Sequence, residues 1–326
     1  MARIYLLPQE GSFYKANLHS HTTVSDGKMT PEESKQRHLE AGYSVVAYTD
    51  HEIYINHEEL NDEKFVALAA YEIDINQWTD RVQRFAQKKT YHINFYDKAP
   101  WENAEEKKET LLPEQRYDDI NYINSFIARM NARGFLSCYN HPYWSLQNYD
   151  DFKALRGLWA MEIYNHGCEV DGLYGYNPQS YDELLRTGAR LYCVSTDDNH
   201  NWAPFGTLYC DSFGGFTMIK APKLDYTSII QAMEQGNFYS SMGPEIEQLY
   251  LEDGVLTVTC SPVEKIYVIT QGRKCYYKMA NPGETITQAQ FKLDGTEGYI
   301  RVDCRDAKGL HANSNAYFID QLGLMG

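Results

Sequence analysis

The sequence of 326 residues has few basic side chains: 30 Lys and Arg stand against 45 Asp and Glu, for a formal charge of −15 at pH 7. Clustered Lys and Arg drive binding to nucleic-acid phosphates, so this balance excludes bulk association with nucleic acid. No run approaches the roughly 18 apolar residues of a membrane span, and residues 1–22 lack the apolar core and cleavage site of a signal peptide. The interpretation is a soluble cytoplasmic chain without a membrane partner.

Cysteine is also sparse: seven occur, an odd number, widely spaced and without a C-x-x-C pair. A secreted disulfide framework would be dense and even in number, so most of these cysteines are expected to be small, buried apolar residues. Gly-rich dinucleotide and P-loop signatures are missing from the sequence too, which ranks nucleotide-cofactor enzymes low. The chain does have ample material for a core, with 43% hydrophobic and 14% aromatic residues, so extensive disorder is excluded.

Short apolar runs, each followed by a polar cluster and a helical stretch, recur through the first three quarters of the chain. The runs are 45–48, 65–70, 135–139, 159–163 and 191–194, and the helix candidates are 30–42, 115–133, 179–187 and 225–235. Continuous apolar runs suit parallel strands that are buried on both faces. Strand–helix alternation therefore predicts a parallel α/β barrel, or a barrel-like sheet, with its chemistry at the carboxyl ends of the strands.

Two regions break this rhythm. The polar segment 76–115, which carries Arg81 and Arg84, is interpreted as a solvated insertion in preference to a lid at the mouth of the site. Residues 244–326 alternate between apolar and polar positions, with turn residues between the runs, which predicts a small antiparallel β sandwich. The predicted domains are therefore 1–243 and 244–326.

Histidine and acidic residues gather just after the predicted strands. His19 and His21 follow one run and would point to one face of a strand, close enough to share a cation. Further members of the group are Asp26, Asp50, His51, Glu72, His141, Asp198 and His200. Carboxylates gathered in one cleft repel one another unless cations offset their charge. Imidazole and carboxylate without thiolate suit Zn, Mn or Fe, so a metal site is predicted.

These stretches resemble the polymerase and histidinol phosphatase (PHP) superfamily of metal-dependent phosphoesterases. The matching segments are 17–23, 25–27, 48–51, 71–72, 140–142 and 195–200, in the order that the family has them. Segment 236–244 further resembles the stand-alone branch that includes carbaryl-hydrolase-like proteins. The resemblance implies a distorted (β/α)7 barrel that holds two or three divalent ions, and it does not extend over the C-terminal β region.

Carried over to this chain, the resemblance implies three groups of ligands. One ion would be held by His19, His21, Glu72 and Asp198, a second by Asp26, His51 and His200, and a third by Glu72, His92 and His141, with Glu72 bridging. The D-x-H spacing favours Asp198 over Asp197 as the ligand. Asp50 is expected to orient its neighbours rather than to bind metal.

The predicted reaction is hydrolysis of a small phosphate ester by a metal-bound water that is activated as hydroxide. His166, after another predicted strand, would protonate the leaving group or bind phosphate, and a structural hydrogen bond is the equal alternative. His38 and His57 are expected to be solvated. Two rival functions stay open: hydrolysis of a carbamate or carboxylic ester on the same metals, and a non-catalytic binding protein that the metals stabilise.

Overall fold

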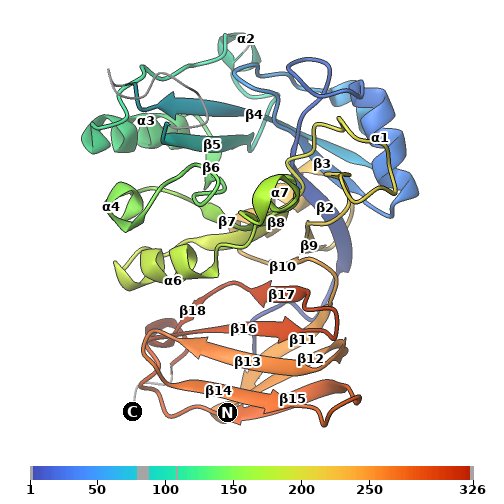
Figure 1. The fold of residues 1–326 in the computed structure, drawn as a ribbon, viewed down its shortest axis with the longest axis vertical. Coiled ribbons are helices and arrows are strands. Elements are labelled where there is room, and N and C mark those ends of the chain that lie inside the picture. Colours follow the sequence, from blue (N-terminus) through green and yellow to red (C-terminus); the bar gives the residue numbers. More distant parts are fainter. Residues whose placement is uncertain (1–2, 79–87, 108, 324–326) are drawn as a thin grey trace.

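The computed structural model describes residues 3–78, 88–107 and 109–323, which form a mixed α/β structure with one large sheet and a second, antiparallel sheet (Figure 1). Arg81 and Arg84 of the predicted insertion lie outside the described residues. The strands of the large sheet that precede residue 244 are β2 (Ser12–Ser20), β3 (Val45–Tyr48), β4 (Val66–Asn76), β5 (Thr90–Asp97), β6 (Phe135–Tyr139), β7 (Ala160–Asn165), β8 (Tyr192–Thr196), β9 (Phe216–Ala221) and β10 (Phe238–Ser241).

The large sheet curls so that its strands β2 and β8 meet. Strands β2, β3 and β4 pair parallel, and so do β6, β7 and β8. At the carboxyl end of β8 the Asp198 N–H donates to the His19 carbonyl at 2.9 Å, and the His21 N–H donates to the Asn199 carbonyl at 3.1 Å. These backbone hydrogen bonds bring the carboxyl ends of strands that are far apart in the sequence into one place.

The predicted helices are confirmed with small shifts at their ends. The longer ones are α1 (Pro31–Glu40), α3 (Ile120–Ala132), α6 (Pro178–Arg186) and α7 (Tyr226–Glu234), and α2 (Ala104–Lys107), α4 (Tyr149–Phe152) and α5 (His166–Gly172) are short. Thr30 caps α1 in the expected capping box, because its side chain accepts from the Glu33 N–H while the Glu33 carboxylate accepts from the Thr30 N–H. The distorted (β/α)7 barrel that the resemblance implies is not confirmed, because β5 pairs antiparallel with both β4 and β6 and so breaks the parallel strand–helix repeat.

Strand β5 corrects one part of the interpretation of segment 76–115 as a solvated insertion, residues 90–97. Every residue of β5 is buried, and the strand pairs with β4 on one side and β6 on the other. Its aromatic and β-branched residues are typical of a strand, but the charged residues before and after it concealed that pattern. The pairing of His92 with Asp74 carries His92 next to the site end of β4. A lid at the mouth of the site stays the alternative interpretation.

The C-terminal region continues the large sheet as well as building the second one. Its strands are β11 (Ile246–Glu252), β12 (Val255–Val263), β13 (Lys265–Thr270), β14 (Cys275–Met279), β15 (Ile286–Lys292), β16 (Tyr299–Arg305), β17 (His311–Ser314) and β18 (Tyr317–Phe318). Strand β17 pairs with β10, so that β17, β16, β13 and β14 extend the large sheet. The second sheet has the order β1–β11–β12–β15, in which β1 (Ile4–Tyr5) comes from the start of the chain.

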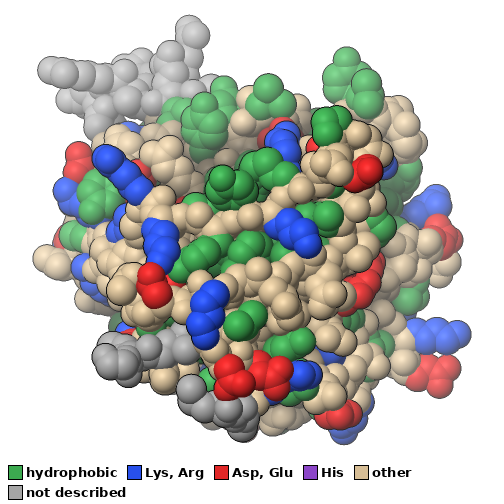
Figure 2. Space-filling view, turned by 90° about the horizontal axis from the view of Figure 1, so that it is seen from below, with side chains coloured by type: hydrophobic (Ala, Val, Ile, Leu, Met, Phe, Trp, Pro, Cys, Tyr) green, Lys and Arg blue, Asp and Glu red, His purple; other side chains and the backbone are tan. Residues whose placement is uncertain are grey.

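Buried apolar side chains of both sheets form one core in the C-terminal region. Leu249 and Val258 from the second sheet share it with Ile266 and Val302 from the large sheet. Figure 2 views this end of the molecule from below, where Lys and Arg side chains lie beside Asp and Glu side chains and between apolar ones. The predicted domain boundary after residue 243 stays a prediction.

Two expectations from composition can be compared with the structure. Among the described residues, no helix is both long and apolar enough to cross a bilayer. Six of the seven cysteines are buried and only Cys275 is exposed, in agreement with their interpretation as small core residues.

Candidate metal centre

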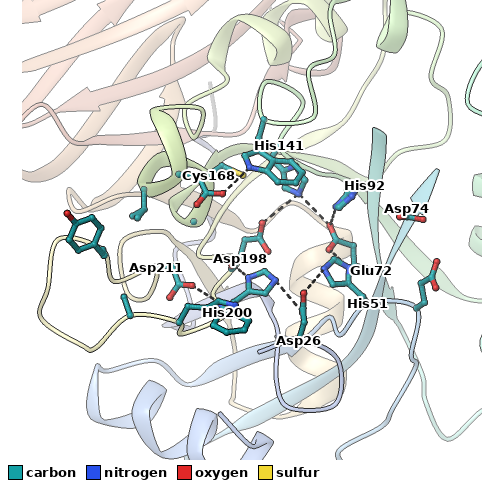
Figure 3. Close-up of a pocket in the computed structure, with 18 residues that line it drawn as sticks. Asp26, His51, Glu72, Asp74, His92, His141, Cys168, Asp198, His200 and Asp211 are labelled. Carbon is teal, nitrogen blue, oxygen red and sulfur yellow. Dashed lines mark hydrogen bonds and ion pairs between the residues drawn. The ribbon is translucent and has the colours of Figure 1, made fainter. Parts of the chain in front are cut away.

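The carboxyl ends of neighbouring strands deliver the candidate ligands to one place. His19 lies near the end of β2, and Glu72 lies within β4. His51, His141 and Asp198 follow β3, β6 and β8 after one or two further residues. Because these ends meet at one edge of the curled sheet, residues that are far apart in the sequence, such as Asp26 and His200, lie together (Figure 3).

Four donor atoms form the tightest group. The His19 Nε2 atom lies 3.1 Å from His21 Nε2, 3.3 Å from Glu72 Oε2 and 3.1 Å from Asp198 Oδ1. His21 Nε2 lies 3.0 Å from Asp198 Oδ1 and 3.5 Å from Glu72 Oε2. Nitrogen and oxygen ligands at about 2.0–2.2 Å from a tetrahedral zinc ion lie about 3.3–3.6 Å apart. The spacing of this group therefore fits one ion among the four atoms.

A second group adjoins the first through His21. The Asp26 carboxylate lies 3.4 Å from His200 Nε2, 3.8 Å from His51 Nε2 and 3.9 Å from His21 Nδ1. These four side chains place one donor atom each within 4.8 Å of the others. The sequence predicted Asp26, His51 and His200 for this group, and the structure adds His21.

A third group adjoins the first through Glu72. The Oε1 atom of Glu72 lies 3.0 Å from His92 Nδ1 and 3.5 Å from His141 Nε2, while its Oε2 atom faces the first group. Asp198 approaches the same group, with Oδ2 3.7 Å from His141 Nε2. The predicted bridging position of Glu72 thus has a geometric basis, because its two oxygens face different groups.

The hydrogen-bonding state of these side chains fits a cation. His19 donates through Nδ1 to Glu162 and therefore presents the Nε2 lone pair to two carboxylate oxygens and a second imidazole nitrogen. His21 Nδ1 and His92 Nε2 are buried without a hydrogen-bond partner. Buried polar atoms are normally paired, and several lone pairs that face one another need a positive charge between them.

The pKa shifts of the group have the same origin. Burial raises the pKa of Glu72, but the imidazoles of His19 and His92 outweigh burial and hold that pKa well below its usual range. Burial lowers the pKa of His200, but the Asp26 carboxylate outweighs it and raises that pKa to about 9. Protons on imidazole thus supply the positive charge when no ion is present, and divalent ions would compete with these protons for the same lone pairs.

Two of the candidate ligands have a left-handed backbone. His141 has φ 23° and Asp198 has φ 53°, a region that non-glycine residues enter at a cost of about 1–3 kcal/mol. Both residues lie two positions after the last residue of a strand, β6 for His141 and β8 for Asp198. Strain at such positions is characteristic of functional sites.

Glu162 belongs to the site although the sequence motifs did not indicate it. It lies within β7, is fully buried, and accepts from four donors. Its Oε1 accepts from His19 Nδ1 at 2.6 Å and from Thr196 Oγ1 at 2.7 Å, and its Oε2 accepts from the His141 N–H at 3.0 Å and from Asn165 Nδ2 at 2.9 Å. The signal in the sequence was a single carboxylate inside an otherwise apolar strand. Carboxylates that fix the free nitrogen of a ligating histidine orient the ring toward metal.

Replacing Glu162 by glutamine is expected to lower metal affinity by roughly 10- to 100-fold, the usual effect of losing a partner behind a ligand. All four partners of Glu162 donate hydrogen bonds to its carboxylate oxygens. The NH₂ group of a glutamine would face some of these donors and could not accept a hydrogen bond from them. Titration of the metal-free variant with zinc against a chelating dye measures the change. An exposed control, Glu252→Gln, should leave the affinity unchanged, and equal affinities in the two variants would refute the role of Glu162.

Two further acidic residues stabilise the loops around the site, as the sequence analysis expected for Asp50. The Asp50 carboxylate accepts from the N–H and hydroxyl groups of Thr22 and Ser25, which fixes the turn before Asp26. Asp197 faces away from Asp198 and accepts from the N–H groups of Phe213, Gly214 and Gly215. Asp197 therefore anchors the loop after β8, and Asp198 is the one that faces the histidines.

His166 is not brought to the three groups. Its Nδ1 lies 2.9 Å from the Tyr164 hydroxyl, and the ring lies so close to Gly214 that a Cβ there would be 2.2 Å from Nδ1. It lines a neighbouring cavity together with Phe205 and Cys210. The structure therefore shows the structural hydrogen bond that was the alternative for His166, and the catalytic role stays a prediction.

The expectation that His38 and His57 are solvated is wrong. His38 is fully buried on α1, where Nδ1 donates to the Ser34 carbonyl at 2.8 Å. His57 is 8% exposed and packs edge-on against Tyr48, with 5.1 Å between ring centroids. Both imidazoles lie on surfaces that face the sheet, which the charged residues around them in the sequence did not indicate.

A cavity of about 890 Å³ opens beside the three groups (Figure 3). His19 and His21 are fully buried beneath its wall. The candidate ligands that line it are Asp26, His51, Glu72, His92, His141, Asp198 and His200. Trp144 forms a neighbouring part of the wall, and its ring packs 5.1 Å from His141 and 5.8 Å from His92. A molecule in this cavity could therefore contact the candidate ligands directly.

No family model matches the chain, and no curated protein does. Among solved structures, the chain is similar to a two-domain protein from Bacteroides vulgatus that contains a predicted PHP-like metal-dependent phosphoesterase. The two are 15% identical over 96% of this chain and 98% of that chain, with a TM-score of 0.47.

Two other solved structures are similar over a smaller part. One is a Bifidobacterium adolescentis protein described as a metal-dependent phosphoesterase, 15% identical over 62% of this chain and 91% of that chain, with a TM-score of 0.39. The other is an amidohydrolase from Chromobacterium violaceum with bound sulfate and no metal, 14% identical over 57% and 87%, with a TM-score of 0.35. None of the three names concerns the carbaryl-hydrolase-like branch.

Proposed function

We propose that this protein is a metal-dependent hydrolase of the PHP type that cleaves a small phosphate ester. The observation that carries the proposal is the group of His19, His21, Glu72 and Asp198 donor atoms, 3.0–3.5 Å apart and flanked by two further groups beside an open cavity. A distorted (β/α)7 barrel is part of the proposal and is supported by the contact between the ends of β8 and β2.

The proposed ligands are the nine residues of the three groups, which would hold two or three ions of Zn, Mn or Fe. Divalent ions in such a site lower the pKa of coordinated water and polarise the oxygens of a phosphoryl group. The chain itself orients the ligands: Glu162 fixes the His19 ring, and Asp50 fixes the turn that carries Asp26. Trp144 shields the third group from one side of the cavity.

The test compares the phosphate, acetate and carbamate esters of one chromophore on protein of known metal content. Protein stripped with a chelator and reloaded with Mn or Zn is expected to bind at least two ions per chain and to hydrolyse 4-nitrophenyl phosphate only when loaded. The same metal in buffer without protein is the control. Release of 4-nitrophenol from the acetate or a carbamate, and not from the phosphate, would contradict the proposal and support the carboxyl-ester alternative. Metal-dependent stability without turnover of any ester would support the binding-protein alternative.

A further inference from the structure

We propose that the part of the cavity beyond the metal groups selects phosphate esters whose leaving group carries no negative charge. This inference rests on the proposed function, since it concerns the leaving group of the same reaction. The term outer pocket is used here for the cavity residues that are not proposed ligands and that carry charge or an aromatic ring: Glu52, Asp74, Asp171, Asp211, Trp144, Trp202 and Tyr209.

The size of the cavity leaves room for a leaving group in the outer pocket. At about 890 Å³ the cavity lies near the upper end of the roughly 300–1,000 Å³ range of ligand sites. The proposed ligands lie between Asp211 on one side and Asp74 on the other (Figure 3), and the phosphoryl group of a substrate would lie against these ligands. The alcohol that leaves must therefore lie against the remaining wall.

The charged groups on that wall are acidic. Among the described residues that line the cavity, none is Lys or Arg, while Glu52, Asp74, Asp171 and Asp211 are all carboxylates. Asp171 accepts from the neutral Trp144 Nε1 at 3.1 Å, and Asp211 accepts from the N–H groups of His200 and Asn201. Neutral donors hold these carboxylates in place without cancelling their charge.

A lysine outside the lining set offsets part of this charge. Lys88 interacts electrostatically with Asp74, although it does not line the cavity. The other three carboxylates of the outer pocket form no ion pair with a Lys or Arg among the described residues. Counted over the described residues, Lys88 and Lys28, whose ammonium group lies against the Trp202 ring, stand against four carboxylates, so this part of the wall keeps a net negative charge.

The inner and outer parts of the cavity therefore differ in sign. Two divalent ions more than offset the charge of the three carboxylates among the proposed ligands. The part of the cavity beside the ligands therefore attracts one phosphoryl group. A second anionic group on the substrate would face the carboxylates of the outer pocket. At the effective dielectric of a protein surface, repulsion between like charges about 8 Å apart lowers the binding affinity by roughly tenfold or more.

The aromatic residues of the outer pocket favour neutral or cationic groups. Trp202 is 67% exposed and Tyr209 is 77% exposed, so both rings are open to a ligand. The ammonium group of Lys28, which lines the adjacent cavity, lies 3.3 Å from the centre of the Trp202 ring. Lys28 therefore occupies one face of the Trp202 ring, and the exposed Tyr209 ring is the aromatic surface that can take a neutral or cationic group of the substrate.

The experiment measures kcat/KM of metal-loaded protein for three esters of equal size. These are 2-aminoethyl phosphate, 2-hydroxyethyl phosphate and carboxymethyl phosphate, whose leaving groups carry positive, zero and negative charge. The expected kcat/KM falls in that order and is roughly tenfold higher for 2-aminoethyl phosphate than for carboxymethyl phosphate. The inference would be overturned if carboxymethyl phosphate were hydrolysed with a kcat/KM equal to or higher than that of 2-aminoethyl phosphate.

A variant tests whether the order comes from the outer pocket. Asp171→Asn removes one charge and retains an oxygen that can accept from Trp144, and it is expected to reduce the ratio of the first ester to the last by roughly threefold or more. Asp150→Asn, on the exposed start of α4 and outside the cavity, is the matched control and should leave the ratio unchanged. An unchanged ratio in Asp171→Asn would count against the inference.

Binding separates this inference from the proposed function. The corresponding phosphonates, 3-aminopropyl, 3-hydroxypropyl and 2-carboxyethyl phosphonate, can be titrated calorimetrically into metal-loaded protein whether or not it turns over esters. The same order of affinity without any turnover would sustain the charge selection and contradict the phosphoesterase proposal. Turnover together with preferred binding of the carboxylate analogue would sustain the phosphoesterase and contradict the charge selection.

Discussion

Replacing Glu72 by glutamine is expected to remove two of the bound ions and to reduce turnover by more than roughly 100-fold. Loss of a residue that only hydrogen-bonds to a ligand typically costs roughly 10- to 100-fold, and Glu72 is itself a proposed ligand. Glu72 faces the first group through Oε2 and the third through Oε1, which also accepts from Asn140 Nδ2 at 2.7 Å. The one oxygen of a glutamine would stay with Asn140, which leaves the third group a neutral amide oxygen in place of a carboxylate, and the NH₂ group would face His19 and His21 of the first group. An NH₂ group donates hydrogen and cannot ligate a cation.

Elemental analysis and kcat/KM for 4-nitrophenyl phosphate measure this result. Asp26→Asn is the matched comparison, because Asp26 belongs to the second group alone and should cost one ion while the fold stays intact. Far-UV circular dichroism of both variants separates loss of ligand from loss of structure. Full metal content in Glu72→Gln would show that Glu72 is not a shared ligand.

Replacing Asp182 by alanine is expected to lower the free energy of unfolding by about 3–5 kcal/mol, because the change leaves a buried charge without its partner. Asp182 on α6 accepts from Arg301 Nε at 2.9 Å and Nη2 at 2.8 Å, and from the Tyr299 hydroxyl at 3.0 Å. Arg301 lies in β16 and is only 2% exposed. The pair thus joins a helix of the first part of the chain to the C-terminal strands.

Urea unfolding followed by circular dichroism measures this change. The double variant Asp182→Ala with Arg301→Met should recover much of the loss, since it removes the unpaired charge along with its partner. Glu234→Ala is the surface control: its carboxylate lies 3.0 Å from Lys98 Nζ, both groups are more than a third exposed, and the expected change is at most about 1 kcal/mol. Equal destabilisation in Asp182→Ala and Glu234→Ala would contradict the buried role of the Asp182–Arg301 pair.

Local patterns predicted the parts of the fold that depend on neighbours in the sequence. The capping box at Thr30 and the apolar run at 135–139 were sufficient for α1 and β6, because caps and buried strands are specified by a few adjacent residues. Strand β5 was missed because its aromatic alternation lies between charged stretches, and only pairing with β4 and β6 buries it. His38 was misjudged for a related reason, since burial depends on what packs over the helix.

The sequence by itself determined which side chains are candidates for metal, because imidazoles and carboxylates recur after successive strands and the chemistry of those groups does not depend on the fold. Only the tertiary structure decided how they are grouped: the contact of β8 with β2 places His19 and Asp198 together, and β5 carries His92 to Glu72. It also showed that Glu162 supports the site and that His166 faces elsewhere. Such distances depend on long-range strand pairing, which no short segment of the chain encodes.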